Sequence, residues 1–252
     1  MQTVNFDRES GIPIYRQLAE YLRSQISSGA YQPGDLLPSE ADLMRDHKVS
    51  RTTARLAFDF IRNIGMIRRE QGKGTIVVSQ VKSNLPLLSS FTEEVERLGR
   101  KPGTVLLSKS NEKLPPEVAS RLGLDPGEVV TKAVRLRTAD GAPIGLAISW
   151  MNDKKFPELK EIDYAVLSLY QVYENQLGLD PLHANESASA DLAGEFEARQ
   201  LGIRPGAPIL RLKRTTFVKS DREESIPIEY VDAVFNGYIY RIEIELYRHR
   251  GT

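Results

Sequence analysis

Apolar positions in the first third of the chain recur with a helical period. Over residues 11–28, Tyr15, Leu18, Leu22 and Ile26 stand three or four positions apart, which is the spacing of one face of a helix. A segment with proline and glycine then interrupts the pattern. The pattern therefore predicts one amphipathic helix followed by a break.

Two more helices are predicted after this break. Ser39 with Asp42 three residues later resembles a capping box, so a short helix should begin there. Ser50 can N-cap a third helix, and Gly65 is well placed to end it. The side chains expected to face inward from the third helix are Leu56, Ala57, Phe60, Ile61 and Ile64.

The pattern then changes to short β-rich runs. MIRRE and TIVV flank the turn QGKG at residues 71–74, as in a β-hairpin. Three helices and a hairpin therefore fill residues 10–78, which we expect to form one domain. The polar, proline-bearing stretch over residues 79–89 predicts a linker.

Helices and long β-rich runs alternate in the rest of the chain. The order of elements repeats once, and LDPGEVVTKAVRLR in the first round is similar to IRPGAPILRLKRTT in the second. This indicates a weak internal duplication, with coincidence between common strand compositions as the alternative. The fold class predicted for the chain is α+β, with an antiparallel sheet domain over residues 90–248.

Overall charge gives no information about partners, because 34 basic residues balance 34 acidic ones. Residues 45–73, however, hold eight basic residues against three acidic ones, a local excess that can attract a polyanion. With no cysteine and three scattered histidines, we expect no metal site and no cofactor. No apolar run approaches the roughly 20 residues that span a bilayer, and no signal peptide is recognisable. We therefore expect a cytoplasmic protein without a membrane partner.

The start of the third helix carries residues suited to reading DNA. Arg51 and Arg55 are four apart and share a face, and arginine can bind guanine bidentately while threonine can contact a thymine methyl group. Hydroxyl and N–H groups at a helix start can bind phosphate. Arginines on a helix are more often a solvated charged face. The basic glycine turn that follows favours DNA, because glycine lets the backbone approach a phosphate closely, and P-loop spacing is absent.

These residues resemble the winged helix-turn-helix of GntR-type transcription regulators. The likeness covers residues 12–78, with LPSE, VSRTT and GKGT at family spacing. The remainder resembles the effector domain of the HutC-type subfamily, whose fold is similar to chorismate lyase, in SFTEE, LDPGEVV, RLRTADGAPI, RPGAPILRLKRTTF and PIEY. The resemblance implies a homodimer that binds a pseudo-palindromic DNA operator and a small-molecule effector. The predicted DNA-binding residues are Ser39, Glu40, Arg45, Ser50, Arg51, Thr52, Thr53, Arg55, Gln71, Gly72, Lys73 and Gly74.

An anion site is predicted on a strand of the second domain. Arg135 and Arg137 lie two apart, so both point to one face and form a fork for an anion. The alternative is that they form surface ion pairs. In HutC-type regulators of phosphorylated sugars, the equivalent arginine pair holds the phosphate, helped by a serine before a helix and by a Ser-x-Tyr motif. The resemblance implies the same role for Arg135 and Arg137. The predicted effector-binding residues are Ser90, Arg135, Arg137, Ser149, Ser168, Tyr170 and Glu229.

Three positions depart from the family pattern. Many GntR-type proteins carry an arginine that contacts DNA where this chain has Ala41, so that contact is lost or is moved to Arg45. Regulators of phosphorylated sugars often carry glutamate where this chain has Ala147, and tyrosine where it has Phe235. We therefore expect an acidic effector that is less sugar-like or more apolar.

Three functions are compatible with the sequence. A repressor released from its operator by a small, anionic effector is favoured. A constitutive DNA-binding repressor, whose second domain only dimerises, is the main alternative. An enzyme is the third, because the effector fold is shared with a lyase. We recognise no nucleophile–base pair, metal set or carboxylate pair, so no catalytic residue is predicted.

Overall fold

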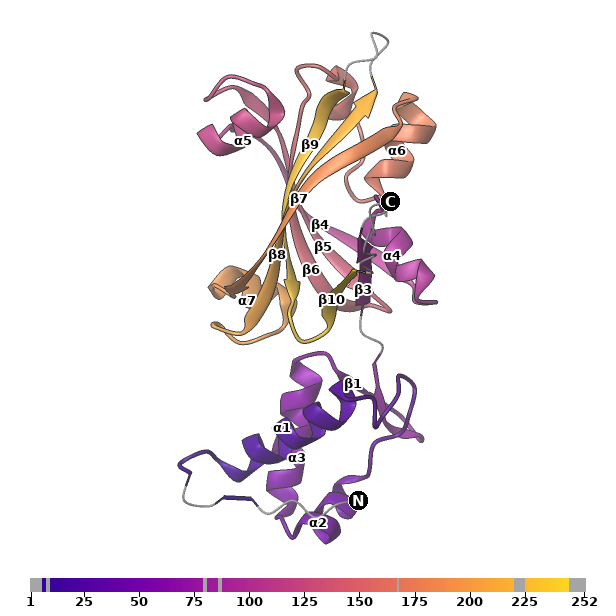
Figure 1. The fold of residues 1–252 in the computed structure, drawn as a ribbon, viewed down its shortest axis with the longest axis vertical. Helices are drawn as coiled ribbons and strands as arrows, with labels where there is room; N and C mark the ends of the chain where they lie inside the picture. Colours follow the sequence, from indigo (N-terminus) through magenta and orange to yellow (C-terminus); the bar gives the residue numbers. More distant parts are fainter. Residues whose placement is uncertain are drawn as a thin grey trace, which may run out of the picture. The chain divides into compact units, whose positions relative to one another are not determined.

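The computed structural model describes residues 6–7, 10–78, 81–85, 88–166, 168–219 and 225–244. Its internal contacts divide the chain into two compact units, Met1–Gln80 and Val81–Thr252. The first is drawn in indigo and violet, and the second runs from magenta to yellow (Figure 1). Among the described residues, no helix is long and apolar enough to cross a membrane.

The first unit has the element order of a winged helix-turn-helix. Its elements are α1 (Ile14–Ser27), α2 (Glu40–His47), α3 (Arg51–Asn63), β1 (Ile67–Glu70) and β2 (Gly74–Val77). Strands β1 and β2 pair antiparallel, and Leu36 adds an isolated bridge to Ile76. Leu18, Leu22 and Ile26 are buried on α1, as the periodicity predicted.

Local capping residues fix where these helices begin and end. Ser39 and Asp42 form the predicted capping box at the start of α2, which satisfies two otherwise unpaired N–H groups. Ser50 accepts a hydrogen bond from the Thr53 N–H at 3.1 Å and so caps α3. Gly65 follows α3 with φ 78°, in the left-handed region that commonly ends a helix. The structure confirms these predictions.

The prediction that Leu56 faces the core was wrong. Its side chain is 40% exposed, and Phe60 is only half-buried. Positions 54, 57, 61 and 64 recur every three or four residues, which is one continuous face of a helix, and Leu56 lies outside that face. The buried residues of α3 and its C-terminal cap are Ala54, Ala57, Phe58, Ile61 and Ile64.

A buried histidine makes the stability of the first unit depend on pH. His47 is 5% exposed and lies between the rings of Phe6 and Tyr21, at centroid distances of 5.8 and 5.3 Å. Burial lowers its pKa, so the unfolded chain binds the proton more readily. Stability should therefore fall as the pH drops below the ordinary histidine pKa of about 6.5.

Thermal unfolding of the full chain between pH 8 and 5.5, followed by circular dichroism, tests this prediction. The variant His47→Phe keeps a ring in the aromatic contact but cannot titrate. The wild type should lose stability relative to this variant as the pH falls. Parallel pH profiles for the two proteins would contradict the prediction.

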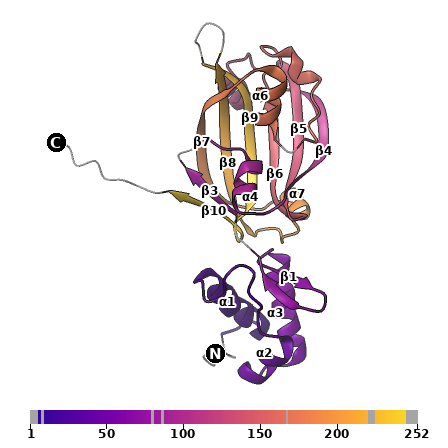
Figure 2. The same ribbon diagram turned by 90° about the vertical axis from the view of Figure 1, so that its right-hand side faces the viewer.

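The second unit is a six-stranded antiparallel sheet in the order β4-β5-β6-β9-β8-β7. Helices α4 and α6 lie on one face, and α5 and α7 lie on the other (Figures 1 and 2). The helices are α4 (Phe91–Arg97), α5 (Pro116–Leu122), α6 (Leu169–Leu177) and α7 (Glu195–Leu201), with a short 3-10 helix η1 (Pro157–Lys160). The strands are β4 (Pro102–Lys113), β5 (Val129–Ala139), β6 (Ala142–Met151), β7 (Pro181–Leu192), β8 (Pro208–Lys219) and β9 (Ser225–Asn236).

The topology supports the predicted internal duplication. The order α4-β4-α5-β5-β6 recurs as α6-β7-α7-β8-β9. The separation along the chain between the starts of β4 and β7, Pro102 and Pro181, equals that between the starts of β5 and β8, Val129 and Pro208. The last strands of the two halves, β6 and β9, pair at the centre of the sheet. The two halves are therefore related by an approximate two-fold axis through this pair.

A short parallel pair departs from the expected linker. Val81–Leu85 form β3, which pairs in parallel with β10 (Tyr240–Ile244). The sequence placed these residues in a linker over 79–89, and for Val81–Leu85 that interpretation was wrong. The end of the last predicted strand, after Ile244, lies outside the described residues.

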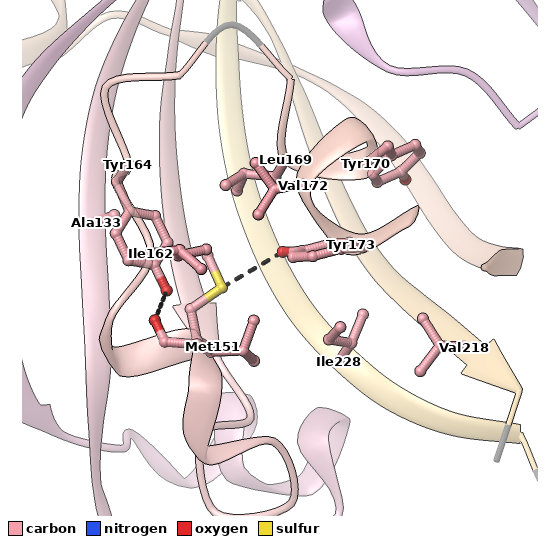
Figure 3. Packing of buried hydrophobic residues seen from close by; sticks show 11 residues of the cluster. Ala133, Met151, Ile162, Tyr164, Leu169, Tyr170, Val172, Tyr173, Val218 and Ile228 are labelled. Carbon is pink, nitrogen blue, oxygen red and sulfur yellow. Dashed lines mark hydrogen bonds between the residues drawn. The ribbon is translucent and has the colours of Figure 1, made fainter. Parts of the chain in front are cut away.

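Two buried tyrosines lie in the core between α6 and the sheet (Figure 3). Tyr164 and Tyr173 are fully buried. The Tyr164 hydroxyl donates to the Leu159 carbonyl at 2.6 Å, and the Tyr173 hydroxyl lies 3.6 Å from the Met151 sulfur. Buried hydroxyl groups are satisfied in this way, and the Tyr173 contact links α6 to β6.

Candidate DNA-reading surface and effector cavity

The first two turns of α3 present the cations that the sequence predicted. Arg51 has an 83% exposed side chain, and Thr52 and Arg55 are also exposed. The buried face of the helix is on the opposite side. A groove of DNA could therefore contact these three side chains. Their roles in DNA binding remain predictions.

Three of the hydroxyls among the predicted DNA-binding residues are already used within the unit. Ser39 donates to the Asp42 carboxylate at 2.7 Å, and the hydroxyls of Ser50 and Thr53 lie 2.8 Å apart. These contacts position the starts of α2 and α3. The groups left for phosphate at the α3 start are backbone N–H groups and the exposed Thr52 hydroxyl.

Glu40 connects three elements of the first unit. Its carboxylate lies 4.0 Å from the Arg51 guanidinium on α3 and 3.9 Å from that of Arg69 on β1. Sequence reasoning did not select Arg69, whose side chain is 71% exposed. Its place in the basic segment 45–73 was the available signal. Glu40 therefore helps to orient two exposed cations. Its ionised carboxylate only accepts hydrogen bonds, so we do not expect it to donate one to DNA.

The turn of the hairpin has the conformation that its glycines allow. Gly72 has φ 78° and Gly74 has φ 113°, which side-chain-bearing residues rarely adopt. Lys73 is 73% exposed, with its ammonium 3.2 Å from the Glu70 carboxylate. That contact lowers the pKa of Glu70. Together with exposed Gln71, the turn offers a basic, closely approachable tip.

Arg45 is held by carboxylates of its own helix. It lies 2.9 Å from Asp42 and 2.8 Å from Asp46, and these two groups, Asp46 first, raise its pKa. Ala41 is exposed one turn earlier. The geometry therefore gives little support to the idea that Arg45 takes over the contact missing at Ala41.

A cavity of about 100 Å³ lies between the sheet and helices α4 and α6 of the second unit. On this measure one water needs roughly 10–15 Å³, so the space suits a small metabolite. Both halves of the duplication contribute to its walls. The lining residues are Ser90, Phe91, Glu94, Arg135, Arg137, Ala147, Ser168, Leu169, Tyr170, Glu186, Leu212, Arg214, Thr216, Glu229, Val231, Ala233, Phe235 and Tyr240.

The two predicted arginines meet in this cavity and are not surface residues. Arg135 is 6% exposed and Arg137 is 4% exposed. Arg137 donates to the hydroxyls of Thr104 at 2.6 Å and Thr92 at 3.1 Å, and its guanidinium lies 4.8 Å from the Phe91 ring. The alternative of exposed surface ion pairs is therefore wrong.

Burial and the neighbouring charge of Arg135 make Arg137 costly to keep charged. Burial, and then the charge of Arg135, lowers the pKa of Arg137 to about 9, although Glu229 opposes the shift. A group with a lowered cationic pKa is stabilised when an anion arrives beside it. The cavity therefore favours an anionic ligand at this end.

Arg135 and Glu229 face each other without a close ion pair. Their charged groups are 3.8 Å apart, and Arg135 Nε and Glu229 Oε1 are buried without a hydrogen-bond partner. The Ser149 hydroxyl lies 3.5 Å from the Arg135 guanidinium, and Ser149 itself does not line the cavity. Buried polar atoms usually have hydrogen-bond partners. A ligand in the cavity can therefore form hydrogen bonds with Arg135 Nε and Glu229 Oε1.

Two of the three predicted serines stand at helix starts on the cavity wall. Ser90 caps α4 and Ser168 caps α6, accepting from the N–H groups of Glu93 at 3.3 Å and Gln171 at 3.4 Å. The Tyr170 hydroxyl lies 3.0 Å from that of Thr216. The structure thus brings Ser90, Ser168 and Tyr170 together with the arginine pair.

Sequence reasoning missed other charged residues of the cavity. Arg214 forms an ion pair with Glu186 and donates to the Ser89 carbonyl at 2.9 Å, which fixes the start of α4. The duplication was an available signal, since Arg214 occupies on β8 the place that Arg135 occupies on β5. Glu94, which accepts from the Tyr240 hydroxyl at 2.9 Å, gave no local signal.

An apolar wall replaces the polar groups expected in a sugar site. Ala147 and Phe235 line the cavity, and the Phe235 ring stacks on Tyr240 at 4.0 Å and on Phe91 at 6.0 Å. Trp150 does not belong to the lining and packs beside Tyr230. The described residues contain no cluster of three or more histidine, aspartate or glutamate side chains that could hold a metal.

Comparisons with known proteins match both units. The description "Bacterial regulatory proteins, gntR family" matches residues 14–77, and "UTRA domain" matches residues 97–241. The HTH-type transcriptional repressor NagR of Bacillus subtilis (strain 168) is 32% identical, covering 94% of this chain and 96% of that protein. The HTH-type transcriptional regulator GgaR of Escherichia coli (strain K12) is 28% identical, covering 86% of this chain and 85% of that protein.

A solved structure shows the same fold. The crystal structure of PhnF from Mycobacterium smegmatis covers 94% of this chain and 100% of its own, with a TM-score of 0.62 and 23% identity. The sequence families and the two described units therefore agree. The chain belongs to the gntR family of bacterial regulatory proteins, in its HutC-type, UTRA-containing branch, and is a DNA-binding transcription regulator.

Proposed function

We propose that the protein is a repressor that a small anionic effector releases from its operator. The observation that carries the proposal is a cavity lined by the buried Arg135 and Arg137, in the same chain as a winged helix-turn-helix. NagR, a relative over nearly the full length, is named a transcriptional repressor. Residues 10–78 would read DNA in the cytoplasm, and residues 90–248 would bind the effector and form the dimer.

Regulation, not turnover, is the activity that the cavity supports. Several of its charged groups contact neighbouring side chains, as Arg137 does Thr104, Glu186 does Arg214 and Glu94 does Tyr240. An effector needs only differential affinity for two states of the protein to shift operator binding. We therefore propose no enzymatic activity.

Two experiments, done one after the other, test the proposal. Selection from a random DNA pool should yield an enriched operator for the wild-type chain. The protein–operator complex is then screened, by fluorescence anisotropy, against a set of phosphorylated and carboxylated metabolites. At least one should release the DNA at micromolar to millimolar concentration. An operator that none of them releases would favour the constitutive repressor.

The protein should be a homodimer joined through the second unit. One winged helix contacts few bases, and symmetric dimers read two half-sites of a pseudo-palindromic operator. The sheet of the second unit ends in two edge strands, β4 and β7, where pairing groups are available. Light scattering at micromolar concentration should give twice the 28.3 kDa of one chain. A monomer with unimpaired operator binding would contradict this.

A further inference from the structure

The exposed side of α3 includes a leucine within its basic part. Leu56 is 40% exposed, directly after Arg55 and one turn after Thr52, which are exposed too. The core of the first unit is built from other positions of α3, such as Ala57 and Ile61. The fold of this unit therefore does not require a leucine at position 56.

Charge on α3 indicates what covers this leucine. Arg51 and Arg55 are exposed beside it, whereas Asp59 forms an ion pair with Arg62 at 2.8 Å. Apart from the 4.0 Å contact between Arg51 and Glu40, the positive charge of α3 is thus concentrated in the first turns, where Leu56 lies. A polyanion complements this charge, and a phosphate backbone is the polyanion that a helix-turn-helix meets.

We propose that Leu56 contacts the C5-methyl group of a thymine and thereby selects thymine at one position of each half-site. This rests on the proposed function, because it takes α3 as the reading helix. In the major groove, thymine shows a methyl group that apolar side chains can contact. Leu56 and Arg55 are consecutive, and consecutive helix residues are close together along the helix axis. The thymine should therefore lie within one or two base pairs of the guanine that Arg55 reads.

Uracil substitution tests this contact with the full-length protein and the selected operator. Replacing a thymine by uracil removes one methyl group and keeps the base pairing. At the contacted thymine, the wild type should bind about fourfold more weakly per half-site, which is the effect of exposing one methyl-sized group. The variant Leu56→Ala should bind thymine and uracil operators equally. Each thymine of the half-site is replaced in turn.

Two control variants separate the contact from general effects. Ile12→Ala removes another exposed apolar side chain of the same unit, 53% exposed and outside α3, and should keep the sensitivity to uracil. Leu56→Met keeps an apolar side chain and should keep it too. Circular dichroism establishes that each variant is folded.

The outcomes distinguish this inference from the proposed function. If the wild type enriches an operator but no thymine-to-uracil change alters its affinity, or if Leu56→Ala discriminates as the wild type does, Leu56 does not read a methyl group. A change in oligomeric state on Leu56→Ala, without loss of uracil sensitivity, would place a second copy on the leucine and also overturn the inference. If no DNA sequence is enriched at all, the proposed function itself fails.

Discussion

Replacing Arg135 and Arg137 together with alanine is expected to leave operator binding intact and to abolish release by the effector. Both side chains are buried on the cavity wall, and charge-assisted hydrogen bonds from paired guanidinium groups are among the strongest that an anion can receive. Losing them should weaken effector binding at least tenfold, because each such bond contributes about 1.5–3 kcal/mol. Anisotropy of labelled operator, with effector titrated, measures the response.

Controls separate loss of effector binding from loss of fold. Lys132→Ala lies on the same strand, and strand alternation places it on the other face, so this variant should respond normally. The double variant leaves Glu229 without its cationic neighbour, which can destabilise the domain. Arg137→Met keeps the contact between Arg135 and Glu229 and should also lose the response. Release of the folded double variant at the wild-type effector concentration would disprove the assignment.

Replacing Arg51 or Arg55 with alanine is expected to weaken operator binding by roughly 1–3 kcal/mol for each arginine and to relax sequence preference at one position. Both side chains are exposed at the start of α3, where recognition helices reach base edges. Binding to random DNA should change far less. Competition titrations of operator against random duplex measure the difference.

Lys73→Ala and Arg45→Ala serve as contrasting variants for this experiment. Lys73 stands at the tip of the hairpin, so its loss should weaken all sequences about equally and lower the slope of log K against log salt by about one. Arg45 is already paired with Asp42 and Asp46, and its loss should have the smallest effect. Unchanged affinity of Arg55→Ala for both operator and random DNA would mean that another face of α3 reads the bases.

Short-range features of the fold were predictable from the sequence. The capping box of Ser39 and Asp42, the Ser50 cap and the end of α3 at Gly65 depend on residues within three or four positions. The two faces of β5 follow from strand alternation, which is why Arg135 and Arg137 could be placed together. The phase of α3 was harder, because Leu56 and Phe60 also have helical spacing. Only the packing of α1 against α3 decides which face is buried.

Long-range pairings could not be predicted in the same way. Strand β3 pairs with β10 from the far end of the chain, and a polar stretch of sequence gives no sign of this. Glu94 and Tyr240 meet across 146 positions. Arg214 could have been predicted from the sequence, because it occupies in the second half of the duplication the position that Arg135 has in the first. Its contact with Glu186 required the pairing of β7 with β8, since these two residues are register partners.

Thermodynamic linkage gives the most direct test of a regulator that is released by its effector. If effector binding lowers operator affinity by some factor, operator must lower effector affinity by the same factor. Isothermal titration of the releasing metabolite into the protein, with and without saturating operator, measures this factor. We expect weaker effector binding in the presence of operator, by the factor found in anisotropy. Equal effector affinity with and without operator would contradict it.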